Sequence, residues 1–257
     1  LSTAAADEPP RPVVYAVATS HLDTQWRWDI RTTIDEYLLN TLDDNFALLE
    51  AYPDYVFNFE GAFRYQLMQE YYPERFERLK DYVRQGRWRV CGTWLDAVDV
   101  NMPSPESLFR HALYGNGWFR RELGVESVDV FLPDCFGFGY ALPSIMAHSG
   151  LTGFTTQKLT WGSAYGVPFD LGRWRGVDGR EVIAAVNPGS YSSDLPGDVS
   201  RDTMALGAVE RTVAKGGPPV AYRFYGTGDV GGAPSETSVA LLAESLRSDG
   251  PLRVIPA

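Results

Sequence analysis

The 257-residue sequence predicts an α/β fold, in which a parallel sheet, either open or closed into a barrel, is covered by helices. From residue 13 onward, short runs of β-branched or aromatic residues alternate with longer stretches of helical periodicity, and this order is typical of parallel strands joined by helices. Hydrophobic residues make up 44% of the chain and charged residues 22%, the ordinary composition of a domain with a buried core. No internal repeat or linker interrupts the pattern, so residues 13–257 are expected to form one domain.

The first half of the chain contains three predicted strands and the helices between them. A buried strand is expected over residues 13–18, where the sequence reads VVYAVA. A helix is expected over residues 33–51, because apolar side chains recur there every three or four residues, and Pro53 ends it. Beyond it we expect strands over residues 55–59 and 88–92 and helices over residues 62–72 and 73–85.

The clearest helix start lies in the second half of the chain. Ser104, Pro105 and Glu106 stand in the order of an N-cap, a first-turn proline and a first-turn acid. Gly124 follows the last apolar position, so this helix is expected to run to about Leu123. The remaining patterns predict strands over residues 127–132, 153–156, 182–186, 219–225 and 252–255, and helices over residues 142–149, 201–215 and 236–247.

Charge and the start of the chain bear on partners and location. The chain carries 33 acidic and 23 basic residues, a net charge of −10, which disfavours nucleic acid as a partner. No apolar run reaches the roughly 18 residues that cross a bilayer, so membrane insertion is not expected.

Residues 1–12 mix small residues, acids and prolines and are expected to be a disordered lead-in. The start at Leu1 favours removal of an export signal, and hence a secreted or periplasmic location over a cytoplasmic one, although trimming explains it equally well. The sequence does not indicate an oligomeric state.

Acids and a histidine follow three of the predicted strands, where α/β folds bind their ligands. His21 and Asp23 come directly after the first strand. Two residues apart in an extended segment, their side chains project to the same side, as a metal ion with nitrogen and oxygen ligands requires. The alternative is a histidine that only hydrogen-bonds a neighbouring turn.

Two more acids follow later strands. Asp134 precedes the sequence FGFG over residues 136–139, so it is either a reactive carboxylate or a turn former. Asp229 lies in the glycine-rich stretch GTGDVGG. That loop lacks the Lys and Ser/Thr of a phosphate-binding loop, and an acid would repel the anion.

Four motifs together closely resemble the catalytic domain of glycoside hydrolase family 38 α-mannosidases. They are TSHLDTQW (residues 19–26), LPDCFG (132–137), TQKLTW (156–161) and YGTGDVGG (225–232). The resemblance runs from about residue 13 to the end, and its order and spacing are specific. It implies a seven-stranded β/α barrel, complete or partial, and one divalent metal ion, usually zinc, that grips two hydroxyls of a terminal α-linked mannose. It also implies exo-acting hydrolysis of a mannose-containing glycan with retention of anomeric configuration.

The resemblance assigns roles to particular residues. Asp134 corresponds to the nucleophile and Asp229, with a more variable loop, to the general acid/base. Lys158 falls where a cation lies near the nucleophile, and Trp26 corresponds to the aromatic platform under the sugar. The metal ligands it implies are His21, Asp23 and Asp134. Tyr191, which follows the turn over residues 187–190, is a weaker candidate for a sugar contact that we do not select.

The chemistry is consistent with this assignment. A retaining glycosidase needs one ionised carboxylate to attack the anomeric carbon and one protonated carboxyl to serve the leaving oxygen. A dication beside Asp134 would keep it charged, while Asp229, farther from the metal, could stay protonated through burial. The expected reaction is a metal-assisted double displacement.

One departure from the family concerns the metal. Its members complete the site with a histidine far downstream, and neither His111, inside a predicted helix, nor His148, at a helix end, fits that place. The helical-bundle and β-sandwich domains that follow the family's barrel are also absent. We therefore expect the N-terminal part of the catalytic domain, with three of four protein ligands. Two rivals remain: a metal-dependent polysaccharide deacetylase, which usually needs a close histidine pair, and a catalytically inactive sugar-binding fragment.

Three further acids at predicted strand ends either line the pocket or shape its loops, and the structural role is favoured. They are Glu60, Asp96 and Asp99.

Overall fold

The computed structural model describes residues 11–162 and 165–257. The expected lead-in over residues 1–12 therefore lies, apart from its last two residues, outside the described residues. The strands are β1 (Val13–Ser20), β2 (Phe57–Glu60), β3 (Trp88–Cys91), β4 (Asp129–Phe131), β5 (Gly153–Thr155), β6 (Leu171–Arg175), β7 (Glu181–Ala185), β8 (Val220–Thr227) and β9 (Arg253–Pro256). The helices are α1 (Ile30–Thr32), α2 (Leu39–Ala51), α3 (Ala62–Tyr71), α4 (Pro73–Arg84), α5 (Pro105–Leu123), α6 (Leu142–His148), α7 (Thr203–Ala214) and α8 (Glu236–Ser245).

The larger sheet is parallel throughout. Its strand order is β3-β2-β1-β8, and β9 also pairs with β1. Strand β8 pairs with the whole of β1, while β9 pairs with its first half and β2 with its second half. Strands β9 and β2 therefore share one edge of β1. The α/β class and the parallel pairing are confirmed.

The smaller sheet has the order β4-β5-β7-β6. Strands β4, β5 and β7 are parallel, whereas β6 runs antiparallel to β7. Strand β6 was not predicted, because it reads LGRWR and forms an exposed edge without a buried apolar run. A tight turn joins it to β7, with Gly179 at a φ of 82°, a conformation that glycine adopts at little cost.

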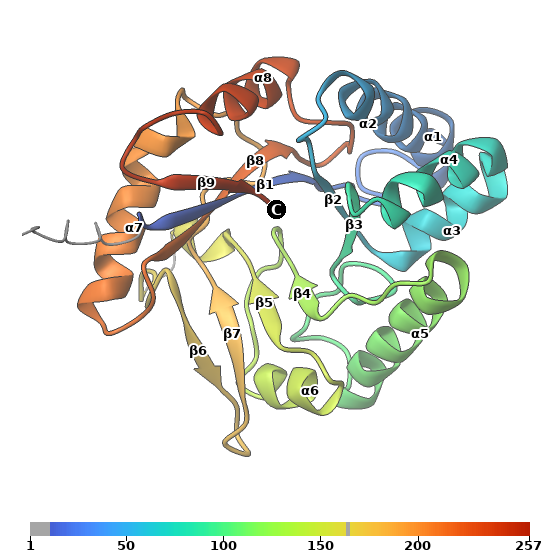
Figure 1. Ribbon diagram of the computed structural model, residues 1–257. Coiled ribbons are helices and arrows are strands. Elements are labelled where there is room, and N and C mark those ends of the chain that lie inside the picture. The colour runs from blue at the N-terminus through green and yellow to red at the C-terminus, as the bar shows by residue number, and fades with distance from the viewer. Residues whose placement is uncertain (1–10, 163–164) are drawn as a thin grey trace, which may run out of the picture.

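A closed seven-stranded barrel is not confirmed. The two sheets are separate, because regular pairing stops between β3 and β4 and between β7 and β8. Isolated backbone hydrogen bonds cross both gaps. The Thr93 N–H donates to the Asp129 carbonyl (2.9 Å), and on the other side the N–H groups of Phe224 and Gly226 donate to the carbonyls of Pro188 (2.7 Å) and Ser193 (3.0 Å). Figure 1 shows helices outside most of the strands, while the end of the hairpin of β6 and β7 projects at the lower left beyond the helices.

The helix ends follow their local signals. Ser104 Oγ accepts the Ser107 N–H (3.3 Å) at the start of α5, and Gly124 ends the helix at a φ of 71°. The helix expected over residues 33–51 is divided, since a π-helical turn over Thr33–Leu38 lies between α1 and α2. Asp29 caps α1 by accepting the Thr32 N–H (3.0 Å).

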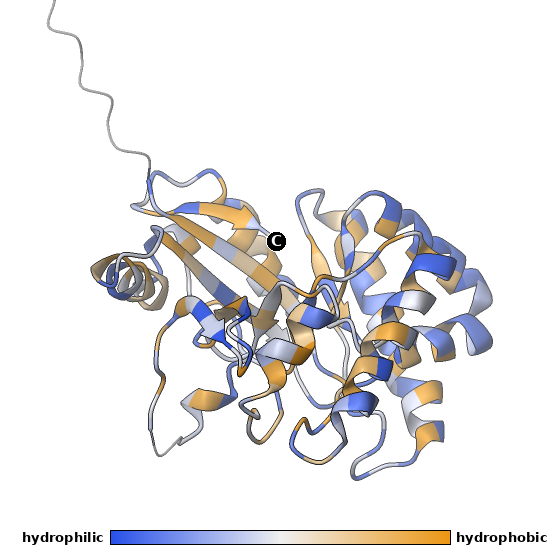
Figure 2. Ribbon diagram, turned by 90° about the horizontal axis from the view of Figure 1, so that it is seen from below, coloured by the Kyte–Doolittle hydropathy of each residue, from blue (hydrophilic) through white to orange (hydrophobic). Residues whose placement is uncertain are grey.

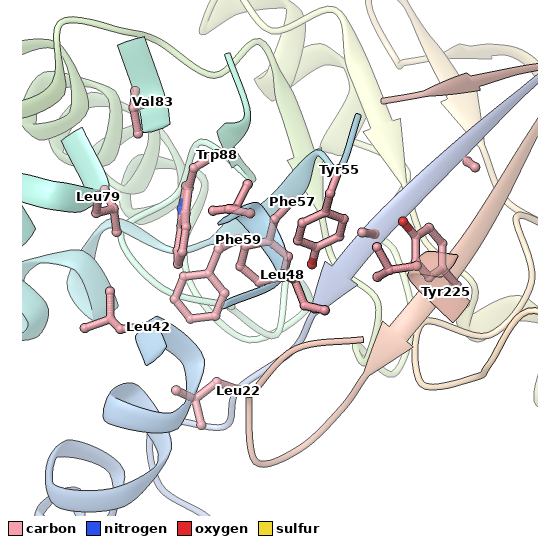
Figure 3. Packing of buried hydrophobic residues seen from close by; sticks show 14 of the residues in the cluster. Leu22, Leu42, Leu48, Tyr55, Phe57, Phe59, Leu79, Val83, Trp88 and Tyr225 are labelled. Atoms are coloured by element: carbon pink, nitrogen blue, oxygen red, sulfur yellow. The ribbon is translucent and has the colours of Figure 1, made fainter. Parts of the chain in front are cut away.

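Aromatic side chains fill the main core between the larger sheet and its helices. Trp88, fully buried, meets Phe57 edge to face, with ring centroids 4.8 Å apart, and lies beside Phe59 (Figure 3). Its indole N–H donates to the Tyr65 hydroxyl (3.0 Å), so burial leaves this polar atom satisfied. Figure 2 shows hydrophobic residues along the strands and hydrophilic residues on the outer helices. Within the described ranges, no helix combines the length and apolar character that a bilayer crossing requires.

Candidate active site

The candidate residues follow the carboxyl ends of parallel strands. His21 follows β1, Asp134 follows β4, Lys158 follows β5, and Asp229 follows β8. Hydrogen bonds between loops draw two of these segments together: the His21 N–H donates to the Thr227 carbonyl (3.0 Å), and the Asp23 N–H donates to the Asp229 carbonyl (2.8 Å). The loops after β1 and β8 therefore run side by side, and their acids lie at one edge of the sheet.

His21 is buried and held from one side. Its Nδ1 lies 2.6 Å from Oε1 of Glu60, which is buried at the end of β2. Its Nε2 lies 3.4 Å from Oδ1 of Asp23 and, although buried, has no hydrogen-bond partner. Burial lowers the pKa of His21, but the negative charge of Glu60 and the adjacent Asp23 outweigh it and raise the pKa to about 9. Buried polar atoms are usually paired, so the Nε2 atom suits an incoming ligand.

Asp134 and Lys158 form an ion pair across the ends of β4 and β5. The Lys158 ammonium lies between two aromatic rings, with Nζ 3.9 Å from the centroid of Trp161 and 4.8 Å from that of Phe136. Such cation–π contacts hold the ammonium in place. Buried Gln157 joins the two strand ends, because its Nε2 donates to the Pro133 carbonyl (3.1 Å). The cation expected near Asp134 is thus in contact with it.

Tyr191 lies beside His21 and close enough to three aspartates to interact with their charges. Its ring meets that of His21 edge to face, with centroids 5.4 Å apart. Burial raises the pKa of the Tyr191 phenol above its ordinary value, and three carboxylates raise it further, those of Asp134, Asp229 and Asp23. One hydroxyl group therefore interacts electrostatically with all three acids. The segment after β7 brings Tyr191 there by pairing with β8, since the Phe224 N–H donates to the Pro188 carbonyl (2.7 Å).

Asp229 has a strained backbone. Among the described residues other than glycine, it alone has a positive φ, 63°. Left-handed backbone at a non-glycine residue is uncommon and is often found at functional sites. The preceding Gly228 has no room for a side chain, because a Cβ there would lie 2.4 Å from Cε2 of Tyr191. The loop is therefore built around the tyrosine.

Trp26 stands apart from these contacts. Its side chain is 55% exposed, the Arg27 guanidinium lies 4.1 Å above the ring centroid, and Trp28 meets it edge to face. These described contacts do not join Trp26 to Asp134 or Asp229.

The remaining acids and histidines have local partners. Glu60 contacts His21; Asp96 contacts Arg64 and Thr24; Asp99 accepts the Asn101 N–H. His111 packs near Trp94, and His148 lies 2.8 Å from Asp178. In the part of the chain that the structure covers, no three His, Cys, Asp or Glu residues are grouped to hold a metal ion. His21 and Asp23 form a pair of potential ligands, while Asp134 is paired with Lys158.

The family model and the sequence relatives point to one family. Residues 11–254 match the family described as "Glycosyl hydrolases family 38 N-terminal domain". The chain is 34% identical over 224 residues to "Alpha-mannosidase G" of Dictyostelium discoideum, which covers 86% of the chain and 20% of the relative. It is 31% identical over 242 residues to "Alpha-mannosidase 2C1" of Homo sapiens, covering 94% of the chain and 23% of the relative.

A solved structure gives the same likeness. An alpha-mannosidase from Enterococcus faecalis superposes with a TM-score of 0.73 at 21% identity, covering 96% of this chain and 28% of that one. The fold is thus shared with that protein. The chain spans about a fifth of the length of the curated relatives it matches.

Proposed function

The chain belongs to glycoside hydrolase family 38, and we propose that its strand-end site hydrolyses terminal α-linked mannose from a mannose-containing glycan in the full-length protein. The single observation that carries this proposal is that Asp23, Asp134 and Asp229 all follow the carboxyl ends of strands, where the Asp23 N–H donates to the Asp229 carbonyl (2.8 Å) and all three charges act on the Tyr191 hydroxyl. Two acids for the reaction and one acid for a metal ion are what a metal-assisted glycosidase needs.

We assign the two catalytic carboxyl groups by their partners. Lys158 contacts Asp134, which favours the charged carboxylate that a nucleophile must be. An Asp134 oxygen forms a bond to the anomeric carbon as the glycosidic bond breaks, and Asp229 gives its proton to the leaving oxygen. Asp229 then removes a proton from water, and the water oxygen displaces Asp134 from the anomeric carbon. Two inversions give net retention.

Tyr191 orients the nucleophile, Asp134. Its raised pKa keeps the phenol protonated at neutral pH, so the hydroxyl can donate a hydrogen bond to the Asp134 carboxylate. A donated hydrogen bond orients the carboxylate without neutralising it. Trp26, with more than half of its side chain exposed, offers a ring surface for the apolar face of a sugar.

A divalent metal ion, with zinc as the metal usual in the family, fits the residues after β1. His21 Nε2 is buried without a hydrogen-bond partner and faces the Asp23 carboxylate at 3.4 Å. Together they offer the nitrogen and oxygen donors that zinc accepts, once binding displaces the proton that the raised pKa of His21 retains. The family resemblance adds Asp134 as a third ligand, and in this structure that carboxylate is paired with Lys158. When bound, the metal would supply a template and a positive charge for sugar hydroxyls. Glu60 would keep the His21 ring in orientation through Nδ1.

The same proposal extends to the fold. Strands β1, β2, β3, β4, β5, β7 and β8 lie in a ring order, and isolated hydrogen bonds bridge both places where regular pairing stops. We take these strands as the seven members of a distorted β/α barrel with helices outside. The distortion supports the site, because the segment that replaces regular pairing between β7 and β8 carries Tyr191.

The test is hydrolysis of an aryl α-mannoside by the full-length protein, followed by proton NMR of the first sugar product. Release of α-mannose before mutarotation would support a retaining mannosidase. A polysaccharide deacetylase would instead release acetate from an acetylated glycan, and an inactive sugar-binding fragment would bind mannoside without turnover. Initial release of β-mannose would contradict the assignment of Asp134 as nucleophile.

A further inference from the structure

A buried arginine holds the segment that carries Asp23. Arg64 lies on α3 with 1% of its side chain exposed. Its Nε donates to the Leu22 carbonyl (2.7 Å), and its Nη2 donates to the same oxygen. Its Nη1 forms an ion pair with Asp96, 2.9 Å from Oδ1, without the alignment of a hydrogen bond. The guanidinium therefore links the carbonyl of Leu22, the residue before Asp23, to the carboxylate of Asp96.

Asp96 also contacts Thr24, the residue after Asp23. Asp96 Oδ2 accepts a hydrogen bond from Thr24 Oγ1 (2.8 Å). The contacts run from the Leu22 carbonyl through Arg64 and Asp96 to the Thr24 hydroxyl, so they hold the residues on either side of Asp23. On its other side, the Asp23 N–H donates to the Asp229 carbonyl (2.8 Å). The backbone is thus fixed on both sides of this one carboxylate.

The site is arranged to accommodate a guanidinium. Gly61 precedes α3 at a φ of 79°, and a Cβ at Gly61 would lie 2.3 Å from Arg64 Nη1. A lysine could not replace the arginine, because its single ammonium lacks the planar fork of donors that reaches a carbonyl and a carboxylate together. The Leu22 side chain is itself fully buried in the main core (Figure 3), which anchors the segment further.

Stability alone is a weak reason for this arrangement. Removing a charged side chain from water costs several kcal/mol, and a buried ion pair often recovers no more than that. What the pair does achieve is a fixed direction for the backbone at residues 22–24. Ligands and catalytic groups need such support, because their geometry must be set before binding.

We propose that Arg64 and Asp96 are positioning residues for Asp23. They hold both of its neighbours and so set the direction of its carboxylate toward His21 Nε2. That Asp23 binds a metal ion rests on the proposed function, whereas the positioning of Asp23 by Arg64 and Asp96 does not.

The experiment compares Arg64→Lys with a matched control, Arg223→Lys. Arg223 is also buried and paired with an acid, with its Nε 3.0 Å from Oδ2 of Asp202, and none of its described hydrogen bonds reaches residues 21–24. Thr24→Val removes the hydroxyl that donates a hydrogen bond to Asp96, whereas Thr24→Ser keeps a hydroxyl at this position. For each variant of this 257-residue chain, three quantities are measured: the thermal midpoint, the dissociation constant for Zn²⁺ by titration calorimetry, and the hydrogen–deuterium exchange of the Asp23 amide.

We expect Arg64→Lys to weaken Zn²⁺ binding by about tenfold or more, the usual effect of losing a group that orients a ligand. The Asp23 amide should exchange at least about tenfold faster, because its hydrogen bond to Asp229 opens more often. Arg223→Lys should lower the thermal midpoint without either change. Thr24→Val should change both quantities in the same direction as Arg64→Lys, and Thr24→Ser should leave them near wild type.

Equal Zn²⁺ affinity and equal Asp23 exchange in Arg64→Lys and Arg223→Lys would overturn the proposal and leave Arg64 as a structural residue. If the wild-type 257-residue chain binds no Zn²⁺, amide exchange decides the positioning alone, and the metal part of the proposed function is decided by chelation of the full-length protein. Faster exchange in Arg64→Lys than in Arg223→Lys would then support positioning, and equal exchange would refute it.

Discussion

Gly228→Ala is a small change whose effect follows from one distance. An added Cβ would lie 2.4 Å from Cε2 of Tyr191, whereas carbon atoms in contact are about 3.5 to 4.0 Å apart. The Tyr191 ring must therefore move by about 1 Å or more. Gly228 is not among the glycines with a positive φ, where any side chain would strain the backbone. The expected destabilisation therefore comes from the contact with the Tyr191 ring.

The ring has little space in which to move. Tyr191 is 2% exposed and packs against His21, so overpacking should cost about 1–3 kcal/mol of the free energy of unfolding. A displacement of about 1 Å at a catalytic group can reduce activity by about 100-fold. We expect Gly228→Ala to lower kcat/KM for an aryl α-mannoside by about that factor in the full-length protein.

Gly197→Ala is the matched control, because no atom lies within 4 Å of a Cβ at that position. It should leave both kcat/KM and the free energy of unfolding, measured by denaturant titration, near wild type. If Gly228→Ala keeps wild-type kcat/KM, the role given to Tyr191 in the site is wrong.

Three further predictions test other parts of the account. Asp229→Ala should greatly slow hydrolysis of mannosides with poor leaving groups and spare those with good ones, since only the former need proton donation; equal loss on both would remove Asp229 as the acid. A chelator should abolish hydrolysis and added Zn²⁺ should restore it, as assayed on an aryl α-mannoside; full activity after metal removal would contradict metal assistance. The hydrogen bond from the Ser144 hydroxyl, together with His148, lowers the pKa of Asp178 from 3.8 to about 2. The ionised Asp178 carboxylate therefore stabilises the folded protein above about pH 4, and this contribution is lost as the pH falls through about 2. The difference in thermal midpoint between wild type and Asp178→Asn should therefore shrink over that range, and a constant difference would count against it.

Local signals in the sequence predicted most of the fold. The start and end of α5 depend on Ser104, Pro105 and Gly124, whose preferences act within a few residues. Strand β6 was missed because an exposed antiparallel edge needs no apolar run, and Gly172 and two arginines hide its alternation. The gaps between the sheets could not be read from the sequence, since they depend on how distant strands pair.

The site divides in the same way. The strand ends predicted that His21, Asp134 and Asp229 would lie close together, because parallel strands bring their carboxyl ends to one side. Tyr191 was set aside, because its position depends on the pairing of the segment after β7 with β8. Strand β7 was itself predicted, so the first buried aromatic residue beyond its end was the signal that could have found Tyr191.

Arg64 gave no signal at all. A single arginine on an amphipathic helix ordinarily faces water, and only the packing of α3 against the loop after β1 reveals that this one is buried.

The central claim is that Asp134 attacks the sugar at a site formed by the acids around Tyr191. A fluorinated mannosyl fluoride that forms a slowly hydrolysed intermediate can be reacted with the full-length protein, and the labelled peptide can be identified by mass spectrometry. The account predicts a covalent mannosyl group on Asp134. A label on any other residue would contradict it.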